Sequence, residues 1–440
     1  MEENKLIKYE GRVVSKVSDA ISIANKLLAI TEPQLIPYRK KDKWGFCTPD
    51  KKMAIDCIYD FTNRFSERVA CIKLNGKWGF IDTKGNMIIP CIFDGAESFE
   101  GSLAEVRLNG KFGYINKQGK IITPIQFDEK HLFFEDLASI KSNEKWGFID
   151  IKGNIAIPCI YDEAWHFSEG LGLVKLNNKW GFIDIKGNIA IPCIYDEAWH
   201  FSEGLASVKI NDKEGFVDKK GNIIIPLLYD YVYTFSDGYC WAELNGRFGF
   251  INKNGETVIP FIYEYTRDFS EGLAPVRMNG KYGFIDKEGN LVIPCIYENI
   301  YSSFSEGLAK VELNDKYGFV DKEGNLVIPC IYDDADSFYK GFAEVSINNE
   351  LSGFDTSGLI DKKGNNITPL IYERIDTVFF DGLSTVKKNG KYGFIDKEGN
   401  LVIPCIYDKA VGFYRDGLSE VFLNGKQGFI NKLGVEYWED

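Results

Sequence analysis

The chain has 440 residues, of which 45% are hydrophobic and 26% are charged, and its formal net charge is −12. This negative charge would repel a phosphate backbone, and the basic residues form no strong cluster, so we expect no nucleic-acid partner. No apolar run approaches the roughly 20 residues of a membrane helix, which predicts a soluble protein with no membrane partner.

Residues 1–34 form an N-terminal segment that differs from the rest of the chain. Its start, MEENKLIKYEGRVVSKVSD, lacks the basic residues and apolar stretch of a secretory signal, so we expect a cytoplasmic protein. Residues 18–30, SDAISIANKLLAI, begin with residues that cap helices and continue with an apolar stripe at helical spacing. We therefore expect a short helix that caps the structure following it.

Residues 35–440 carry twelve copies of one pattern, in which a lysine, an aromatic residue, a glycine and a second aromatic residue usually follow one another. The pattern glycines are 34 residues apart over the first eight copies and lie at Gly45, Gly79, Gly113, Gly147, Gly181, Gly215, Gly249, Gly283, Gly318, Gly358, Gly393 and Gly428. A fixed period of this length predicts stacked or radially arranged units rather than one globular core. The longer step to Gly358 predicts an insertion near residues 347–357.

Each copy contains three strand-like stretches, which residues 273–304 illustrate. The first stretch has apolar residues at every second position and ends at Asn279-Gly280, a dipeptide that favours tight hairpins. The second holds Gly283 between two aromatic residues, and the third is LVIPCIY at 291–297. We expect the three stretches to form an antiparallel meander, with an aromatic side chain from a neighbouring strand or repeat covering the glycine.

The third stretch is apolar on both faces, which predicts that both faces are covered. It carries proline in ten copies, and because proline cannot donate a ladder hydrogen bond, we expect this strand at the sheet edge or bulged. A phenylalanine after this strand is expected to act as a wedge between repeats; its copies are Phe167, Phe201, Phe235, Phe269 and Phe304.

These units predict an all-β fold in which about twelve three-stranded meanders stack as an open superhelix, similar to a β-solenoid. The alternative is a β-propeller. Twelve three-stranded units exceed the usual four to eight four-stranded blades. The first unit begins with its own first strand and the last ends on its own shortened third strand, so neither is expected to share strands. Both considerations favour the open array.

The units KWGFIDTKGNMIIPCIFD (77–94) and KYGFIDKEGNLVIPCIYD (391–408) resemble the WG repeat of bacterial proteins, which is named for its Trp-Gly pair. The resemblance extends over nearly the whole chain from about residue 35. Other residues occupy the tryptophan position in several copies, namely Phe112, Glu214, Phe248, Tyr282, Tyr317, Tyr392 and Gln427. The resemblance implies a bacterial repeat scaffold and brings no catalytic motif with it.

Few residues suggest chemistry. Seven of the ten cysteines recur at one repeat position without any CxxC pair, which predicts reduced core thiols rather than a metal site or a disulfide framework. Of the three histidines, two are copies of one position, and no hydrolase, P-loop or metalloprotease motif is present. The Asp-x-x-Gly-Asn turns carry lysine beside the aspartate, so we interpret them as turn formers rather than calcium sites. We expect no enzyme activity and no metal or cofactor.

The most distinctive residues are aromatic and histidine side chains in the loops, which vary between copies. The candidate partner-binding residues are Trp165, His166, Trp199, His200, Tyr231, Tyr233, Trp241 and Tyr301. They can pack between repeats or contact a partner. The preferred hypothesis is a non-catalytic scaffold that binds another protein through an acidic, aromatic-studded surface, and the alternative is a module that binds glycan or cell-wall polymer.

Overall fold

The computed structural model describes residues 7–9, 12–14, 34–131, 133–300, 303–349, 354–414 and 416–440. These residues form strands and turns, and none of them lies in a helix or in an apolar helical span that could cross a bilayer. The capping helix expected at 18–30 lies outside the described residues. The chain divides into two compact units, one of residues 1–104, 117–119 and 437–440 and one of residues 105–116 and 120–436.

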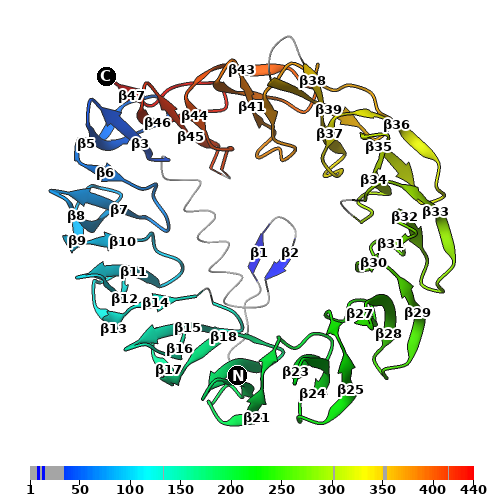
Figure 1. Ribbon diagram of the computed structural model, residues 1–440. Helices are drawn as coiled ribbons and strands as arrows, with labels where there is room; N and C mark the ends of the chain where they lie inside the picture. Colours follow the sequence, from blue (N-terminus) through cyan, green and yellow to red (C-terminus); the bar gives the residue numbers. More distant parts are fainter. Residues whose placement is uncertain are drawn as a thin grey trace. The chain divides into compact units, whose positions relative to one another are not determined.

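Three long strands recur in the repeats (Figure 1). The first long strands are β3 (Ile36–Lys40), β7 (Val69–Leu74), β11 (Leu103–Leu108), β15 (Leu137–Ser142), β19 (Leu171–Leu176), β23 (Leu205–Ile210), β27 (Tyr239–Leu244), β31 (Ala274–Met278), β34 (Leu308–Leu313), β38 (Phe342–Asn349), β41 (Ser384–Lys388) and β45 (Leu418–Leu423). The second long strands are β4 (Lys43–Cys47), β8 (Lys77–Asp82), β12 (Lys111–Asn116), β16 (Lys145–Asp150), β20 (Lys179–Ile183), β24 (Lys213–Asp218), β28 (Arg247–Asn252), β32 (Lys281–Ile285), β35 (Lys316–Asp321), β39 (Phe354–Asp361), β42 (Lys391–Ile395) and β46 (Lys426–Asn431). The third long strands are β5 (Met53–Tyr59), β9 (Met87–Phe93), β13 (Ile121–Phe127), β17 (Ile155–Tyr161), β21 (Ile189–Tyr195), β25 (Ile223–Tyr229), β29 (Thr257–Tyr263), β33 (Leu291–Tyr297), β36 (Leu326–Tyr332) and β43 (Leu401–Tyr407).

A fourth, short strand precedes the first long strand in most repeats. The short strands are β6 (Phe61–Thr62), β10 (Gly95–Ala96), β14 (Glu129–Lys130), β18 (Glu163–Ser168), β22 (Glu197–Ala198), β26 (Tyr231–Val232), β30 (Tyr265–Thr266), β37 (Asp334–Ala335), β40 (Arg374–Ile375) and β44 (Lys409–Ala410). A separate hairpin pairs β1 (Ile7–Tyr9) with β2 (Arg12–Val14), and β47 (Trp438–Glu439) ends the chain.

The sheet order β22-β23-β24-β25 shows the arrangement of one repeat, in which all neighbours are antiparallel. The meander of three long strands is therefore confirmed. The expectation of only three strands was incomplete, because a two-residue strand such as β22 is too short to produce a period in the sequence. The third long strand lies at the sheet edge, as its proline predicted.

The third long strand is also bulged, and the bulge explains the pattern glycine. In β32 and β33, Tyr282 pairs with Tyr297 but Phe284 pairs with Ile293, so four residues of β33 span two residues of β32. The bulged backbone crosses Gly283 so closely that a Cβ atom there would lie 2.4 Å from the carbonyl oxygen of Ile293. The expectation that an aromatic side chain covers this glycine was wrong, since backbone covers it.

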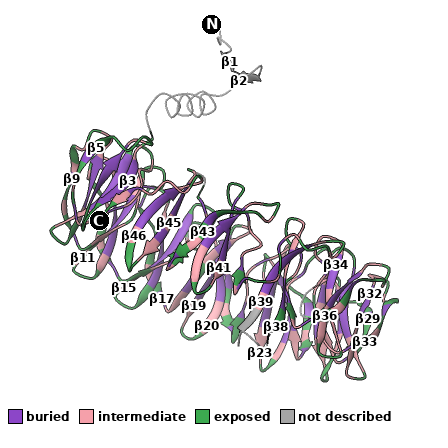
Figure 2. Cartoon of the chain, turned by 90° about the horizontal axis from the view of Figure 1, so that it is seen from above, coloured by how far each residue is buried: buried purple, intermediate pink, exposed green. Residues whose placement is uncertain are grey.

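Only one face of the third long strand is buried (Figure 2). In β33, Ile293 and Tyr297 are buried, whereas Leu291 and Ile296 are 49% and 52% exposed. The expectation that both apolar faces are covered was therefore wrong. From Ile293 to Tyr297 inward and outward residues alternate, so the second apolar row, which includes Ile296, is left in solvent.

The recurrent phenylalanine is confirmed as a wedge between repeats. Phe167, which leads into β19, contacts Phe148 of the preceding sheet with ring centroids 5.0 Å apart, and Phe201 repeats this contact with Phe182 at 4.9 Å. The residue after Phe167 adds a hydrogen bond across the following seam, between the fifth and sixth repeats, because the Ser168 hydroxyl donates to the carbonyl of Phe201 at 2.8 Å. Each seam thus buries rings and satisfies backbone oxygens.

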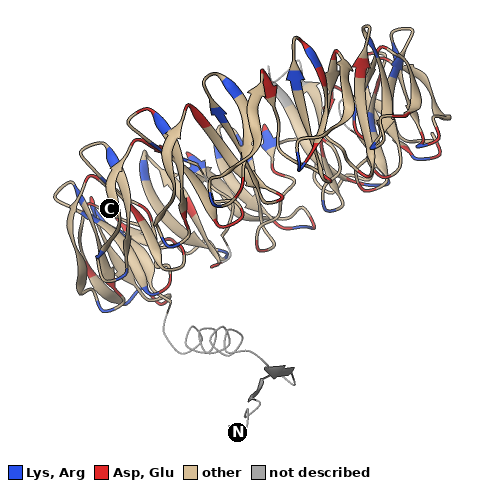
Figure 3. Cartoon of the chain, turned by 90° about the horizontal axis from the view of Figure 1, so that it is seen from below, with Lys and Arg blue, Asp and Glu red and all other residues tan. Residues whose placement is uncertain are grey.

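A carboxylate strengthens each seam from the surface. Glu169 accepts a hydrogen bond from the backbone N–H of Gly204 at 3.1 Å and pairs with Lys219 at 3.0 Å. The same relay links Glu271 to Gly307 and Lys322. Figure 3 shows that lysine and carboxylate positions alternate along the turns. The glutamates and lysines of these relays are therefore engaged in repeat-to-repeat contacts.

The aspartate turns have the geometry that the turn-former interpretation predicts. In the turn 286–290, Asp286 Oδ1 accepts the backbone N–H groups of Glu288 and Asn290 at 3.0 and 2.7 Å, and the Asn290 amide donates to Asp286 Oδ2 at 2.8 Å. Both carboxylate oxygens are thus occupied by the turn itself.

All ten cysteines are free thiols, as expected. The seven recurrent ones are half-buried rather than buried in the core. Cys159 Sγ, for example, lies 3.8 Å from the carbonyl oxygen of Ile140 on the first long strand. Burial raises the pKa of the Cys159 thiol, so these thiols are protonated at neutral pH.

The first unit contains both ends of the repeat region. β47 pairs in parallel with β3, and this pairing completes the sheet β47-β3-β4-β5. The prediction that the first and last repeats share no strand was therefore wrong. A sheet shared between the first and last repeats is also found in propellers, and the all-β repeat fold itself is confirmed.

The extra residues of the tenth copy lengthen a hairpin. β38 and β39 have eight residues each and pair from Phe342↔Asp361 to Asn349↔Phe354. The described part of the insertion expected at 347–357 thus extends two strands.

Candidate functional site

Most of the sheets that begin with a short strand present a pair of variable positions beside it. The first position donates its backbone N–H to the carbonyl of the second, as in His131 to Ser139 at 2.9 Å and Trp199 to Ser207 at 3.0 Å. We call these positions the variable row; its members include His131 and Ser139, Trp199 and Ser207, Tyr233 and Trp241, Asp336 and Glu344, and Asp376 and Thr385. Trp165 in β18 and Leu173 in β19 occupy the matching sequence positions of their repeat and are counted with the row. The frame around them repeats almost unchanged, so the row is where one repeat differs from the next.

The fourth to sixth repeats bring aromatic and histidine rings of the row into continuous contact. His131 stacks on Trp146 at 4.7 Å and on Trp165 at 5.8 Å between ring centroids. Trp165 meets the edge of His200 at 6.5 Å. We call Phe134, His131, Trp146, Trp165, His166 and His200 the histidine–aromatic cluster.

A second chain of contacts passes through the same cluster. His166 and His200 stack with ring centroids 3.7 Å apart and an interplanar angle of 20°, and Phe134 lies 4.3 Å from His166. Trp165 and Phe134 remain 46% and 44% exposed. The cluster thus combines an interior that joins repeats with rings that face solvent.

The two stacked histidines are neutral at pH 7. Burial, followed by the nearby His131, lowers the pKa of His166. Burial, followed by His166, lowers the pKa of His200 to about 4, and its Nδ1 is buried with no hydrogen-bond partner among the described residues. Neutral rings are required for this packing because a charged ring would lose solvation without gaining a counter-ion.

A second aromatic group lies in the seventh repeat. Trp241 stacks on Tyr231 at 5.4 Å and on Tyr233 at 5.0 Å, the latter with an interplanar angle of 12°. Tyr233 is 40% exposed, so this group also presents a flat ring to solvent.

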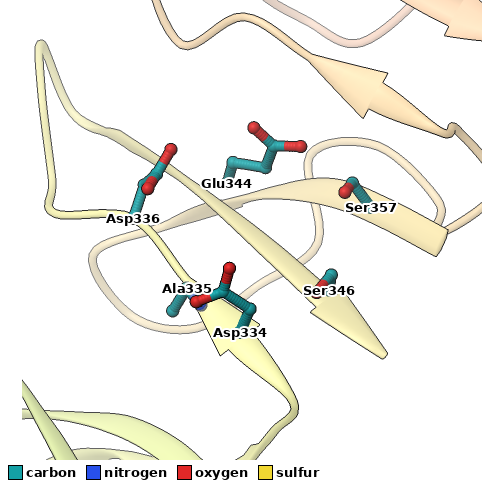
Figure 4. Close-up of a pocket in the computed structure, with 6 residues that line it drawn as sticks. All are labelled: Asp334, Ala335, Asp336, Glu344, Ser346 and Ser357. Atoms are coloured by element: carbon teal, nitrogen blue, oxygen red, sulfur yellow. The ribbon is translucent and has the colours of Figure 1, made fainter. Parts of the chain in front are cut away.

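Acidic residues occupy the variable row further along the chain. Asp334, Asp336 and Glu344, with Ser346 and Ser357, line a hollow of about 110 Å³, where the three carboxylates surround one opening (Figure 4). Burial, ahead of all other causes, raises the pKa of Glu344. Within the described residues, no group of three histidine, cysteine or carboxylate side chains has the arrangement of a metal site.

The structure therefore brings some of the predicted site residues into contact and adds further residues to the site. Trp165, His166 and His200 come together, whereas Tyr231, Tyr233 and Trp241 form their own group. Trp199 lies half-buried in the row, and Tyr301 falls outside the described residues.

Sequence reasoning missed three cluster members. His131 could have been found, because it lies 34 residues before Trp165 at the same repeat position. Phe134 and Trp146 gave no comparable signal, since one lies in a turn and the other is an ordinary copy of the aromatic pattern.

Small antiparallel sheets in tandem, carrying a row of variable side chains, define a β-repeat protein. The family model described as "WG containing repeat" matches eleven times, and the chain belongs to this family. The matches cover residues 44–78, 78–112, 112–146, 146–180, 180–213, 215–248, 248–282, 282–317, 317–350, 358–392 and 392–426. No curated protein matches the chain.

Solved structures show only remote similarity. A crystal structure described as the eukaryotic initiation factor is 9% identical over 76% of this chain and 95% of its own, with a TM-score of 0.32. The extracellular domain of a putative hybrid two-component system from B. thetaiotaomicron is 9% identical over 91% and 69%, with a TM-score of 0.23. Kluyveromyces lactis Hsv2 is 12% identical over 59% and 94%, with a TM-score of 0.26.

Proposed function

We propose that this chain is a non-catalytic binding scaffold that holds another protein along the variable row, with the histidine–aromatic cluster as its main contact. The observation that carries the proposal is the run of ring contacts from His131 to His200, which leaves Trp165 exposed at its surface. Large aromatic side chains that are packed at the base and open at the top are the residues on which protein interfaces most depend.

The frame of the repeats supports the same proposal. Its lysines, carboxylates and phenylalanines are used in seams and turns, so the frame supplies stiffness and the row supplies the differences. An extended row of shallow positions suits a macromolecular partner better than a small substrate, which needs a deep pocket. The net charge of −12 makes nucleic acid an unfavourable partner, and we place the activity in the cytoplasm as part of the proposal.

The test is affinity capture from the native host with the wild-type chain and with Trp165→Ser and Tyr233→Ser as baits. Loss of a Trp or Tyr contact at the centre of an interface typically costs about 2 kcal/mol or more, so we expect captured partner to fall by at least about tenfold for one or both variants. Quantitative mass spectrometry of the retained proteins gives the measurement.

Tyr339→Ser is the matched control, because Tyr339 is 46% exposed but lies in a turn outside the variable row. Its capture should equal that of the wild type. Equal retention by all baits would remove the row as the binding surface. Retention of a glycan panel instead, lost in Trp165→Ser, would replace the protein partner by the alternative glycan partner, since sugars also stack on exposed rings.

A further inference from the structure

Three consecutive sheets are joined by one short column of rings. Phe134 precedes β15, His166 lies in β18, and His200 follows β22, so the contacts Phe134–His166 and His166–His200 each cross a seam between sheets. The ring contacts of Trp165 with His131 and His200 cross the same two seams, and the other seam contacts described above use phenylalanine, a serine hydroxyl, backbone or an ion pair. The histidine column is the part of the seam that can change charge near neutral or mildly acidic pH.

The surroundings of the column make a charge there unfavourable. The titratable groups that act on His166 are His131, which opposes protonation, and Glu135, which favours it. Glu135 also accepts the backbone N–H of Gly170 at 2.8 Å, so it is engaged in the seam. The group that acts on His200 is His166 itself, and Trp165 contributes only an uncharged ring.

Stacking at 3.7 Å is favourable for two neutral imidazoles and unfavourable for two imidazolium ions. A proton on His200 would enter a site where Nδ1 has no acceptor. The ring can take up that proton fully only by turning toward water, which separates it from His166.

We propose that the His166–His200 stack is a proton-sensitive clasp that holds the fifth and sixth repeats together when both rings are neutral and separates when they are protonated. Separation removes the edge that supports Trp165, and the regulatory role of the clasp rests on the proposed function of that surface. Acidification therefore loosens the seam and weakens partner binding at the same site.

The first experiment follows the isolated, full-length protein by NMR with labelled histidine, because the chain has only three histidines to assign. We expect His200 to titrate with a pKa near 4 and His166 below the ordinary value of about 6.5. A His200 signal that titrates near 6.5 would overturn the clasp.

The second experiment measures amide hydrogen exchange in 163–168 and 197–202 between pH 7.5 and pH 3.5, after correction for intrinsic exchange rates. Because one unit of pKa depression corresponds to a tenfold shift in the opening equilibrium, we expect at least about tenfold more opening at low pH. In His200→Phe, which keeps a ring but cannot be charged, the acid-induced opening should be lost. In His131→Phe it should persist.

Equal acid-induced opening in wild type and His200→Phe would overturn the proposal, because other groups would then cause it. These measurements need no partner, so they separate the clasp from the proposed function. If capture at pH 7.5 does not depend on Trp165 while the acid opening is present, only the proposed function fails. If capture does depend on Trp165 but weakens equally on acidification in wild type and His200→Phe, the clasp does not regulate that surface.

Discussion

At the scale of single residues, the pattern glycine is fixed by the backbone that crosses it. At Gly283 a Cβ atom would lie 2.4 Å from the Ile293 oxygen and 2.8 Å from the Cys295 nitrogen. Backbone atoms in a bulge cannot move aside as a flexible side chain can. This steric restriction explains why glycine occupies the position whichever aromatic residue precedes it.

We expect Gly283→Ala to destabilise the eighth repeat by about 3 kcal/mol, because the bulge of β33 must shift to accept the methyl group. Urea unfolding followed by local hydrogen exchange gives the measurement. Gly280→Ala is the matched control: its φ is +77° but only the Arg277 guanidinium lies as near as 4.0 Å, so we expect about 1 kcal/mol. Equal losses at both sites would show that conformation rather than contact sets the cost.

The site could be predicted only in part at this scale. Loop aromatics such as Trp165 and Tyr233 differ between copies, and this difference in the sequence marks the variable row. The contact of His166 with His200 could not be predicted, because a sequence shows that two residues are one period apart but not that their rings meet across the seam.

At the scale of strands and sheets, the pairing between β47 and β3 joins the two ends of the repeat region. The backbone N–H of Lys41 donates to the carbonyl of Glu439 at 2.7 Å, and Arg39 pairs with Asp440 at 2.7 Å. Tyr437 is buried, and its hydroxyl lies 3.4 Å from the carbonyl oxygen of Pro49. Four C-terminal residues therefore complete the first sheet.

Truncation of the Tyr437 side chain tests this pairing. We expect Tyr437→Ala to cost about 3 kcal/mol locally, as the loss of a buried aromatic side chain does, and to speed amide exchange in β3. The control is Leu433→Ala, because Leu433 is 86% exposed and its loss leaves no cavity. Unchanged exchange in β3 for Tyr437→Ala would mean that the first sheet is stable without its C-terminal strand.

The long strands were predictable because their turns and apolar alternation are strong signals, as Asn279-Gly280 and the aspartate turn at 286–290 show. Most of the short strands and β47 were not, since they have two residues each and two residues carry no period. The burial of the third long strand was predicted only in part: Ile293 and Tyr297 face inward as expected, but the opposite row with Ile296 stays exposed. Apolar character alone does not show whether a neighbour covers a strand face.

At the scale of the whole molecule, acidification should lower stability in two separate pH windows. His200 has a folded-state pKa of about 4, so its contribution is complete above the unfolded value of about 6.5 and is lost as the pH falls to about 4. The turn aspartates, such as Asp184, have a lowered pKa because Asn188 and backbone N–H groups bind the carboxylate. Their contribution is lost only below their ordinary value of about 4.

The loss of stability in the higher pH window tests the contribution of His200. Between pH 7 and pH 4.5 we expect the wild type to lose on the order of 1–2 kcal/mol more than His200→Phe, after allowance for the solvent that reaches the ring. Thermal unfolding at the two pH values gives the measurement. Equal losses in both proteins would assign the acid sensitivity to carboxylates alone.

Residues 145–171 and 179–205 are identical, so His166 and His200 occupy the same position in two identical copies. A ring that stacks on its own copy needs no second mutation to acquire a partner, since tandem copying of the gene segment supplies both members together. In such a chain, duplication can create a new contact in a single event, and later divergence of either copy would remove it.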